Sequence, residues 1–380
     1  MTNLTRRQIL LGGGALAAAG ILPAIPKTPL TPRMQFMSAA LAADIPRPEY
    51  MVRLNANENP YGPSRVALQS VSANMHLTNR YSNGPDELMQ VVAGLNGVST
   101  DHVVVGTGSA EILRVAGMLV GMSGGSVVCV DPTFQDLLEY AEAAGSEIIR
   151  VPVNEGLNAD LDGMRRALRN DTRMVYLVNP NNPIPSVIEK NAMREFVLEM
   201  SRDRLVFIDE AYHEYVENPD YASMIELVAA GHRNIIVSRT ASKIHGLAGM
   251  RVGFGYAHPE LIREMRWRKT GENDVLSVAA AQASYQDDEF QNFARRKNNE
   301  SKAIIESMCE ELGIRYVKSN ANFTFINTGM ENRAFQERMR EFGLLTGRDF
   351  PPYDKSWARI SFAKPEEIEY FVEIYKRLFA

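Results

Sequence analysis

A lysine and an arginine in one glycine-containing turn are the residues of this sequence most suggestive of chemistry. The stretch runs Ser242-Lys243-Ile244-His245-Gly246-Leu247-Ala248-Gly249-Met250-Arg251. An ammonium group is costly to bury, so a lysine among small and apolar residues needs a reason. Condensation of the amine with an aldehyde is such a reason, because a Schiff base removes the charge. Gly246 and Gly249 would let the backbone approach a flat ligand, and Arg251 offers a planar fork for a phosphate. The alternative is an ordinary surface turn.

The elements that must position this turn alternate between strand and helix. Strands are expected at residues 102–105, 126–130, 147–153, 174–178, 205–208 and 234–238, with helical segments between them. This alternation is typical of a mostly parallel central sheet flanked by helices on both faces, an α/β fold. Ligands of such sheets bind beyond the carboxyl ends of the strands. The polar residues of interest lie at those ends: Gly108-Ser109, Asn182, Asp209, Thr240 and Lys243.

A carboxylate and a tyrosine follow the strand at 205–208. Asp209 ends an apolar run, and a buried carboxylate needs a partner. A protonated pyridine nitrogen would be one, since the ion pair keeps the ring an electron sink. Helix capping by Asp209 or Glu210 is the competing account. Tyr212 can reach an oxygen of the same ring, and so can the amide of Asn182 unless Asn179–Pro183 is only a capped turn.

Three further groups have the chemistry of anion ligands. Gly106-Thr107-Gly108-Ser109-Ala110 leads from a strand into a helix, whose N-terminus suits a phosphate. Thr240 and Ser242 add hydroxyls near Arg251. In Trp357-Ala358-Arg359-Ile360-Ser361, Arg359 can clamp a substrate carboxylate or lie on a solvated sheet edge. Arg348 can bind an anionic side chain or cap a turn.

Composition excludes several classes of protein. With 45% hydrophobic and 23% charged residues among 380, the chain has the make-up of a soluble globular protein. A net charge of −5 without a Lys/Arg-rich run argues against nucleic-acid binding. Two cysteines make no disulfide framework, and Cys129 lies in a buried-strand pattern. We expect no metal site.

The N-terminus has the pattern of an export signal. Arg6-Arg7 precedes a 17-residue uncharged run from Ile9 to Ile25, and Ala40-Leu41-Ala42 is a plausible cleavage site before Ala43. The paired arginines resemble a twin-arginine signal, with an ordinary secretory signal or an uncleaved membrane anchor as alternatives. Segment 1–42 holds four basic and no acidic residues, so its removal would change the net charge from −5 to −9. We therefore expect a periplasmic protein with no stable membrane insertion after cleavage.

The rest of the chain is predicted to form an arm and two domains. The arm covers residues 43–75, the large domain 76–265 and the small domain 266–380. After about Met265 the pattern changes to a long helical stretch from Val275 to Leu312. Strands are expected at 314–317, 323–327 and 357–361, which makes the small domain α+β.

Taken in order, these motifs resemble the fold-type-I pyridoxal-phosphate (PLP) aminotransferases, and most of all their histidinol-phosphate aminotransferase branch. The resemblance extends from about Arg53 to the C-terminus. No single motif decides it, but the order and spacing together are specific. The motifs are Asn55–Pro63, Gly108–Glu111, Asp131–Phe134, Asn179–Pro183, Asp209–Tyr212, Ser242-Lys243 with Arg251, and Trp357–Ile360.

The resemblance implies a role for each site residue. Lys243 would hold the cofactor and move protons, Asp209 would pair with the pyridine nitrogen, and Asn182 and Tyr212 would bond the ring oxygen. Arg359 would bind the substrate, with Tyr61 and Arg348 near its side chain. Tyr81 would reach the phosphate in a neighbouring subunit, which implies a homodimer. The phosphate would be held by Ser109, Ala110, Thr240, Ser242 and Arg251.

The implied reaction moves an amino group between a small-molecule amino donor and a keto acid. Two departures put the substrate and the exact reaction in question. Ile184-Pro185 stands where the family usually has Thr-Gly, near the expected substrate, and Leu137 stands where a ring-stacking aromatic is common, with Phe134 or Tyr140 as substitutes. Histidine biosynthesis is cytoplasmic, so an exported copy is not expected to serve it. The alternatives are another PLP reaction (oxidase, decarboxylase, racemase or lyase) or a binding protein that retains PLP without turnover.

Overall fold

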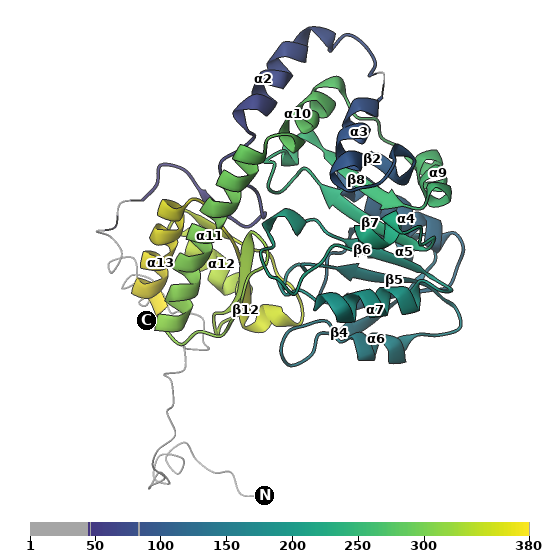
Figure 1. Ribbon diagram of the computed structural model, residues 1–380. Helices are drawn as coiled ribbons and strands as arrows, with labels where there is room; N and C mark the ends of the chain where they lie inside the picture. The colour runs from purple at the N-terminus through teal and green to yellow at the C-terminus, as the bar shows by residue number, and fades with distance from the viewer. Residues whose placement is uncertain (1–44, 46, 83, 380) are drawn as a thin grey trace, which may run out of the picture.

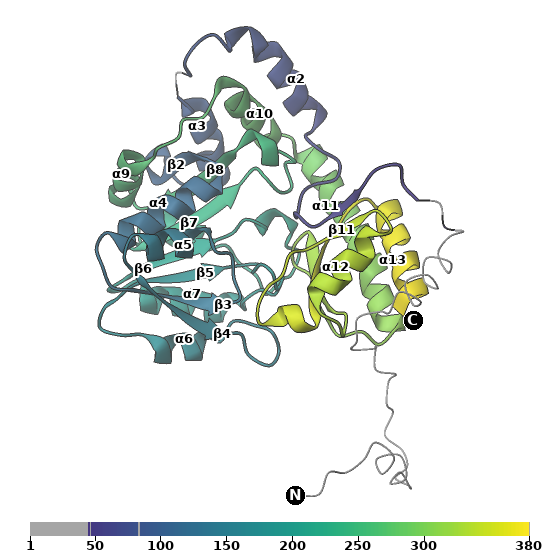
Figure 2. The same ribbon diagram turned by 180° about the vertical axis from the view of Figure 1, so that it is seen from behind.

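The computed structural model describes residue 45, residues 47–82 and residues 84–379. Figures 1 and 2 show a larger body around a twisted sheet and a smaller body formed mainly by the C-terminal third of the chain. The export signal predicted over 1–42 lies outside the described residues. Among the helices that are described, none is long and apolar enough to cross a membrane.

A mixed sheet forms the centre of the larger body. In the described chain its strand order is β2-β8-β7-β6-β5-β3-β4. All strands run parallel except β8, which pairs antiparallel with both β2 and β7. The strands are β2 (Val103–Thr107), β3 (Ser126–Asp131), β4 (Glu147–Pro152), β5 (Thr172–Val178), β6 (Leu205–Asp209), β7 (Ile235–Thr240) and β8 (Val252–Ala257). This arrangement confirms the mostly parallel sheet predicted from the sequence.

Helices cover both faces of this sheet, as the alternating pattern predicted (Figures 1 and 2). One face packs against α4 (Ser109–Gly121), α5 (Asp136–Ala143) and α9 (Pro259–Arg268). The other packs against α3 (Asp86–Leu95), α6 (Leu161–Ala167), α7 (Lys190–Met200), α8 (Ile225–Ala229) and α10 (Val275–Tyr285). Cys129 is fully buried in the first of these cores, where burial raises the pKa of its thiol to about 12.

The smaller body has its own core between helices and two small sheets. Strands β9 (Tyr316–Val317), β10 (Phe323–Asn327) and β12 (Trp357–Ser361) form an antiparallel sheet in the order β12-β10-β9. Strand β1 (Val52–Leu54) pairs parallel with β11 (Leu344–Thr346), so the predicted N-terminal arm docks on this body. The helices are α11 (Asp288–Glu311), α12 (Asn332–Arg340) and α13 (Pro365–Phe379).

Helix α2 (Arg65–Asn74) forms the last part of the arm and lies against α10. Ser64 caps it, accepting a hydrogen bond from the backbone N–H of Ala67 at 3.2 Å. Short 3₁₀ helices cover Met75–Leu77, Thr100–His102, His213–Tyr215, Ala248–Met250 and Tyr353–Lys355. Three of these adjoin segments that carry predicted site residues.

Two differences between the structure and the sequence prediction have a local cause. The continuous helical stretch expected from Val275 to Leu312 is two helices, because the Asp287 carboxylate accepts from the N–H of Phe290 at 3.0 Å and starts α11 afresh. Strand β8 was not predicted, since Gly253 and Gly255 interrupt the β-branched pattern that marks strands.

Candidate active site

One cavity of about 640 Å³ lies beyond the carboxyl ends of the parallel strands, between the two bodies. Its walls come from the N-terminal arm, the large sheet and the small body, so no single segment of the sequence contains it. Eleven of the predicted site residues line it: Ser109, Ala110, Asn182, Asp209, Tyr212, Thr240, Ser242, Lys243, Arg251, Arg348 and Arg359.

One end of the cavity has the donors of an anion site. Helix α4 begins at Ser109, after Gly108 with φ +83°, and its first turn faces the cavity. A Cβ on Gly108 would lie 2.3 Å from Nη2 of Arg251, so only glycine lets this guanidinium reach the helix N-terminus. Arg251 itself has φ +56° and donates to the carbonyl of Ala248 at 2.9 Å. Helix N–H groups and a guanidinium together suit a phosphate.

Two hydroxyls complete that end. Thr240 and Ser242 are both buried and line the cavity, and Thr240 donates to Oγ of Ser242 at 3.0 Å. The N–H of Ser242 in turn donates to Oγ1 of Thr240 at 3.2 Å. The Ser242 hydroxyl proton is therefore available to a ligand in the cavity.

Asp209 ends β6 in the cavity wall and is 3% exposed. Ser238 lies opposite it on β7 and donates to its Oδ1 at 2.7 Å. Burial raises the pKa of Asp209 to about 6, against the opposing effects of Ser238, the Lys243 ammonium and the N–H of Ala211. Because this carboxylate forms no ion pair within the described residues, it can accept a cationic ring nitrogen.

Lys243 follows β7 in the predicted turn and lines the same cavity. Desolvation by the cavity walls lowers the pKa of its amine to about 8, and the nearby guanidinium of Arg359 acts in the same direction. Its Nζ lies 5.5 Å from the ring centroid of Tyr212. A buried amine with this pKa is partly neutral near pH 8, as a nucleophile and proton carrier requires.

Arg359 is a buried clamp on the side of the cavity that the small body contributes. Its Nη1 donates to Oδ1 of Asn182 at 2.7 Å and its Nη2 to the carbonyl of Asn55 at 2.5 Å. Its Nε has no partner among the described residues. Burial lowers its pKa to about 10, and Tyr212 opposes this effect. The strand that carries it, β12, is an edge strand of the three-stranded sheet. Arg359 is nevertheless only 6% exposed, so its side chain is not solvated and the clamp interpretation fits the geometry.

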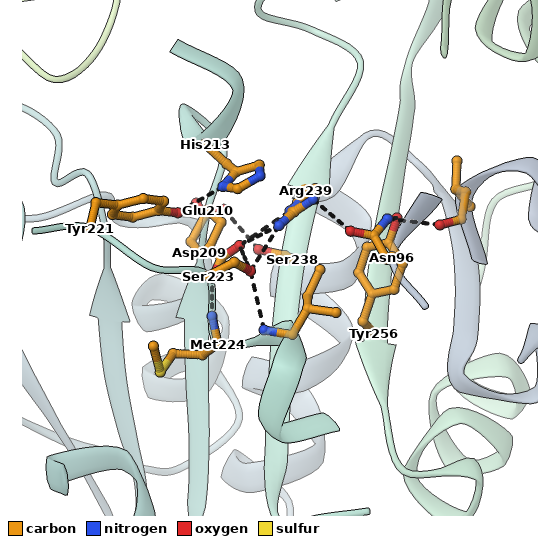
Figure 3. A network of polar contacts seen from close by, with 12 residues as sticks. Asn96, Asp209, Glu210, His213, Tyr221, Ser223, Met224, Ser238, Arg239 and Tyr256 are labelled. Atoms are coloured by element: carbon orange, nitrogen blue, oxygen red, sulfur yellow. Dashed lines mark hydrogen bonds and ion pairs between the residues drawn. The ribbon is translucent and has the colours of Figure 1, made fainter. Parts of the chain in front are cut away.

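A second polar network centres on Glu210 and Arg239, which directly follow Asp209 and Ser238 in the sequence (Figure 3). Glu210 accepts from Nε and Nη2 of Arg239 at 3.1 and 3.0 Å, and also from the hydroxyl of Ser223 and the N–H of Met224. The other terminal nitrogen of Arg239 donates to Oδ1 of Asn96 at 2.7 Å. Glu210 does not line the cavity, so this network holds strands and loops together beneath it.

Several expectations from the sequence are wrong in this structure. Gly246 meets the backbone of Gly62, where an added Cβ would lie 2.2 Å from its carbonyl oxygen, and neither Gly246 nor Gly249 lines the cavity. Ile184 and Pro185 are buried and neither lines the cavity, and Ile184 belongs to the core of the larger body.

The missing stacking aromatic also has a structural answer. Leu137 is fully buried in the core under α5. Of the two possible substitutes, Phe134 lines the cavity. Tyr140 does not line it, is 38% exposed and stacks on Arg114. Asn181 supports the loop before Phe134, since it accepts from Thr133 at 2.8 Å and donates to the carbonyl of Pro132 at 3.0 Å.

Two predicted site residues do not line the cavity of this chain. Tyr61 packs edge-on against Phe293 of α11 at 4.9 Å between ring centroids. Tyr81 is 95% exposed, and its predicted reach into a neighbouring subunit stays a prediction.

Sequence reasoning also missed part of the wall. Asn57 and Glu58 belong to the family-like motif Asn55–Pro63, but the sequence alone assigns them no role. No local sequence pattern distinguishes the other wall residues Arg114, Asp136, Gln336 and Arg340. These last four residues come together only because α4, α5 and α12 border the same cavity.

The residues present fit pyridoxal phosphate. One cavity is lined by an anion site, a buried carboxylate and a lysine, which match the phosphate, the pyridine nitrogen and the aldehyde of this cofactor. Across the described chain there is no group of three or more His, Cys, Asp or Glu side chains that could hold a metal ion.

Comparison with known proteins decides the family. The model of the aminotransferase class I and II family matches residues 49–374. This chain belongs to the class I and II aminotransferases. It is 32% identical over 333 residues to a histidinol-phosphate aminotransferase of Moorella thermoacetica, covering 87% of this chain and 86% of that protein. It is 31% identical to the histidinol-phosphate aminotransferase of Halalkalibacterium halodurans, covering 84% and 86%.

A solved aminotransferase shows the cofactor. The crystal structure of histidinol-phosphate aminotransferase from Sinorhizobium meliloti, in complex with pyridoxal 5'-phosphate, superposes with a TM-score of 0.79 and 25% identity. It covers 95% of this chain and 98% of that one. The fold is therefore the fold-type-I PLP-transferase fold, and this class I and II aminotransferase is a PLP-dependent enzyme. PLP supplies an aldehyde carbon and an electron-accepting ring.

Proposed function

We propose that this aminotransferase acts outside the cytoplasm on an amino donor with a second anionic group, and that it does not serve histidine biosynthesis. The observation that carries the substrate class is a pair of guanidinium groups on the small body. Arg340, at the end of α12, and Arg348, after β11, both line the cavity and are exposed to solvent. Within the described residues neither forms an ion pair, and Arg348 only stacks on Phe350.

The two ends of the cavity divide the work. Arg359 binds the carboxylate nearest the reacting carbon, and Lys243 moves the proton there. Arg340 and Arg348 receive an anion at the far end of the donor, because unpaired guanidinium groups in a cavity bind carboxylate or phosphate well. The names of the relatives specify a phosphate-bearing substrate for those proteins, and this chain keeps room for a phosphate or a second carboxylate.

The proposal about location depends on Arg6-Arg7 and the apolar run after it. An exported aminotransferase would meet its donors in the periplasm, and a twin-arginine route would carry it folded with its cofactor. Replacing Arg6-Arg7 by a lysine pair should retain the precursor in the cytoplasm, as judged by cell fractionation. Unchanged export of that variant would contradict the twin-arginine assignment.

We also propose a homodimer, in which Tyr81 reaches the second active site. Sedimentation of the purified protein tests the assembly. Mixing a Y81F chain with a K243A chain tests the reach. Each variant alone should turn over poorly, and an active mixed dimer requires the tyrosine of one subunit to serve the other. A monomer, or no recovery on mixing, would count against this part.

The experiment that tests the substrate is a donor panel without an acceptor. The PLP-loaded protein is mixed with neutral, dicarboxylic and phosphorylated amino donors, and loss of the cofactor's visible absorbance is followed. Anionic donors should react best, and R348A and R340A should raise KM for them by about 10-fold each. The same variants should leave neutral donors unchanged, which separates a substrate contact from damage to the fold.

Two outcomes would redirect the proposal. Release of ammonia or uptake of oxygen without an acceptor would indicate another PLP reaction. Rescue of a histidine auxotroph by a cytoplasmic form lacking residues 1–42 would contradict the proposed separation from histidine biosynthesis.

A further inference from the structure

The hydroxyl of Tyr212 is held by a side chain from the N-terminal arm. Asn57 donates its amide N–H to Oη of Tyr212 at 2.9 Å. Asn57 is 2% exposed and has φ +53°, a backbone conformation that asparagine tolerates better than most residues. Asparagine at position 57 is therefore favoured both by its backbone conformation and by the hydrogen bond of its side chain.

Ser361 determines which way this amide faces. Its hydroxyl lies 2.6 Å from Oδ1 of Asn57, and the backbone N–H of Asn57 donates to the same hydroxyl oxygen at 2.9 Å. Because a hydroxyl has a single proton, Ser361 gives it to Oδ1. The NH₂ end of the Asn57 amide then faces Tyr212, and in the reverse orientation the Ser361 proton would lose Oδ1 as its acceptor.

The consequence concerns the single proton of Tyr212. Its oxygen accepts from Asn57, so its own O–H is not used in that contact. No hydrogen bond donated by this hydroxyl occurs within the described chain, and Tyr212 lines the cavity on the side of Lys243. The chain of donors therefore runs from Ser361 through Asn57 to Tyr212 and ends in the cavity.

We propose that Asn57 is a positioning residue: by donating to Tyr212 it keeps the tyrosine proton directed at the ring oxygen of bound PLP, and Ser361 orients the amide that does so. This rests on the role that the family resemblance gives Tyr212. Burial raises the pKa of Tyr212 to about 12, so the hydroxyl keeps its proton at neutral pH.

The arrangement also joins the cofactor end to the substrate end. Ser361 lies two residues after Arg359 on β12, so both side chains leave the strand on the same face. Arg359 contacts Asn182 while Ser361 acts through Asn57 on Tyr212. Residues expected at the ring oxygen are thus both supported from one strand of the small body.

The test is a set of variants read by a titration rather than by turnover. For each PLP-loaded protein, the midpoint of the pH-dependent visible absorbance of the cofactor is measured. Y212F removes the donor to the ring oxygen, which should raise the midpoint by about one unit. N57D should raise it similarly, because a carboxylate only accepts and would draw the tyrosine proton away from the cavity.

Coupling distinguishes the proposal from a general effect of charge or folding. N57D should add little to Y212F in the double variant, since both act through one proton. S361A, which frees the amide to rotate, should shift the midpoint in the same direction by a smaller amount and serves if N57D does not fold.

Three results would overturn the proposal or its basis. An unchanged midpoint in N57D and S361A, beside a shifted one in Y212F, would overturn the role of Asn57. An equal effect of N57D with and without Tyr212 would show that charge alone acts. An unchanged midpoint in Y212F would remove the role of Tyr212 itself, while the aminotransferase activity and its substrate would stand.

Discussion

Asp209 and Glu210 are neighbours in the sequence, both almost fully buried, yet they have opposite kinds of partner. Glu210 is 1% exposed and accepts two hydrogen bonds from Arg239 beneath the sheet (Figure 3). Asp209 is 3% exposed, accepts a hydrogen bond from the hydroxyl of Ser238 and lines the cavity. One carboxylate is neutralised by the protein, and the other is prepared for a ligand.

The alternation of side chains along strands explains the difference. Asp209 pairs in register with Ser238, and the next residues, Glu210 and Arg239, point to the opposite face. A full ion pair beside the cavity would satisfy Asp209 and leave nothing for a cofactor. Buried carboxylates are therefore not equivalent evidence for function: the one that lacks a cation is the functional candidate.

The largest expected effect comes from removing the charge of Asp209. D209N should weaken cofactor binding by about 10²–10⁴, because losing one partner of a buried ion pair costs about 3–5 kcal/mol. The apoprotein should not lose stability. The pKa of Asp209 is about 6 in the fold against an ordinary 3.8, so its folded form binds the proton more tightly and stability falls as pH rises from 3.8 through 6.

Two measurements check this prediction. PLP titration of the apoprotein gives the affinity, and urea unfolding at pH 5 and pH 7.5 gives the stability. D209N should remove the contribution of Asp209 to the change of stability between these pH values. A large loss of apoprotein stability in D209N would show that Asp209 is structural like Glu210.

The converse prediction concerns Arg239. R239M should lower the free energy of unfolding by about 3–5 kcal/mol, because it leaves Glu210 buried without a cation. The double variant E210Q/R239M should recover much of this loss and still bind PLP within about threefold of the parent. Urea unfolding and PLP titration of the three proteins test it, and a double variant that cannot hold PLP would mean that the network acts on the cavity.

Ser238 tests the partner that Asp209 does have. S238A should weaken PLP binding by about 10- to 100-fold, since a hydrogen bond to a charged group is worth about 1.5–3 kcal/mol. S238T keeps a hydroxyl and is the matched control, expected to bind nearly as well as the parent. Equal binding by all three would show that Ser238 does not prepare Asp209.

The smallest effect is on the reactivity of Lys243. The pKa of its amine is about 8, lowered by burial and raised in part by Asp209. The rate of PLP capture by the apoprotein should therefore rise with pH to a plateau above about 8. D209N removes an anion and should move this midpoint down by less than about one unit, whereas E210Q/R239M should leave it in place. Stopped-flow absorbance measures both, and equal shifts would erase the distinction between the two carboxylates.

Much of the site was predictable because the residues that can do chemistry follow the carboxyl ends of the predicted strands. Asp209, Lys243 and Asn182 follow predicted strands, and parallel strands bring their carboxyl ends to one edge. Local patterns failed where a residue contributes through packing alone. Gly246 meets Gly62 rather than a ligand, and β8 was hidden by its two glycines.

By itself, the sequence determined the fold class, the family and eleven of the residues that line the cavity, because short-range patterns and motif order record them. The tertiary structure alone decided what those residues touch. Asp209 is hydrogen-bonded to Ser238, Tyr212 to Asn57 and Arg359 to Asn182, and the two residues of each pair are 29 to 177 positions apart in the sequence. Such contacts depend on strand register and on the docking of the arm and the small body, and no local pattern encodes either.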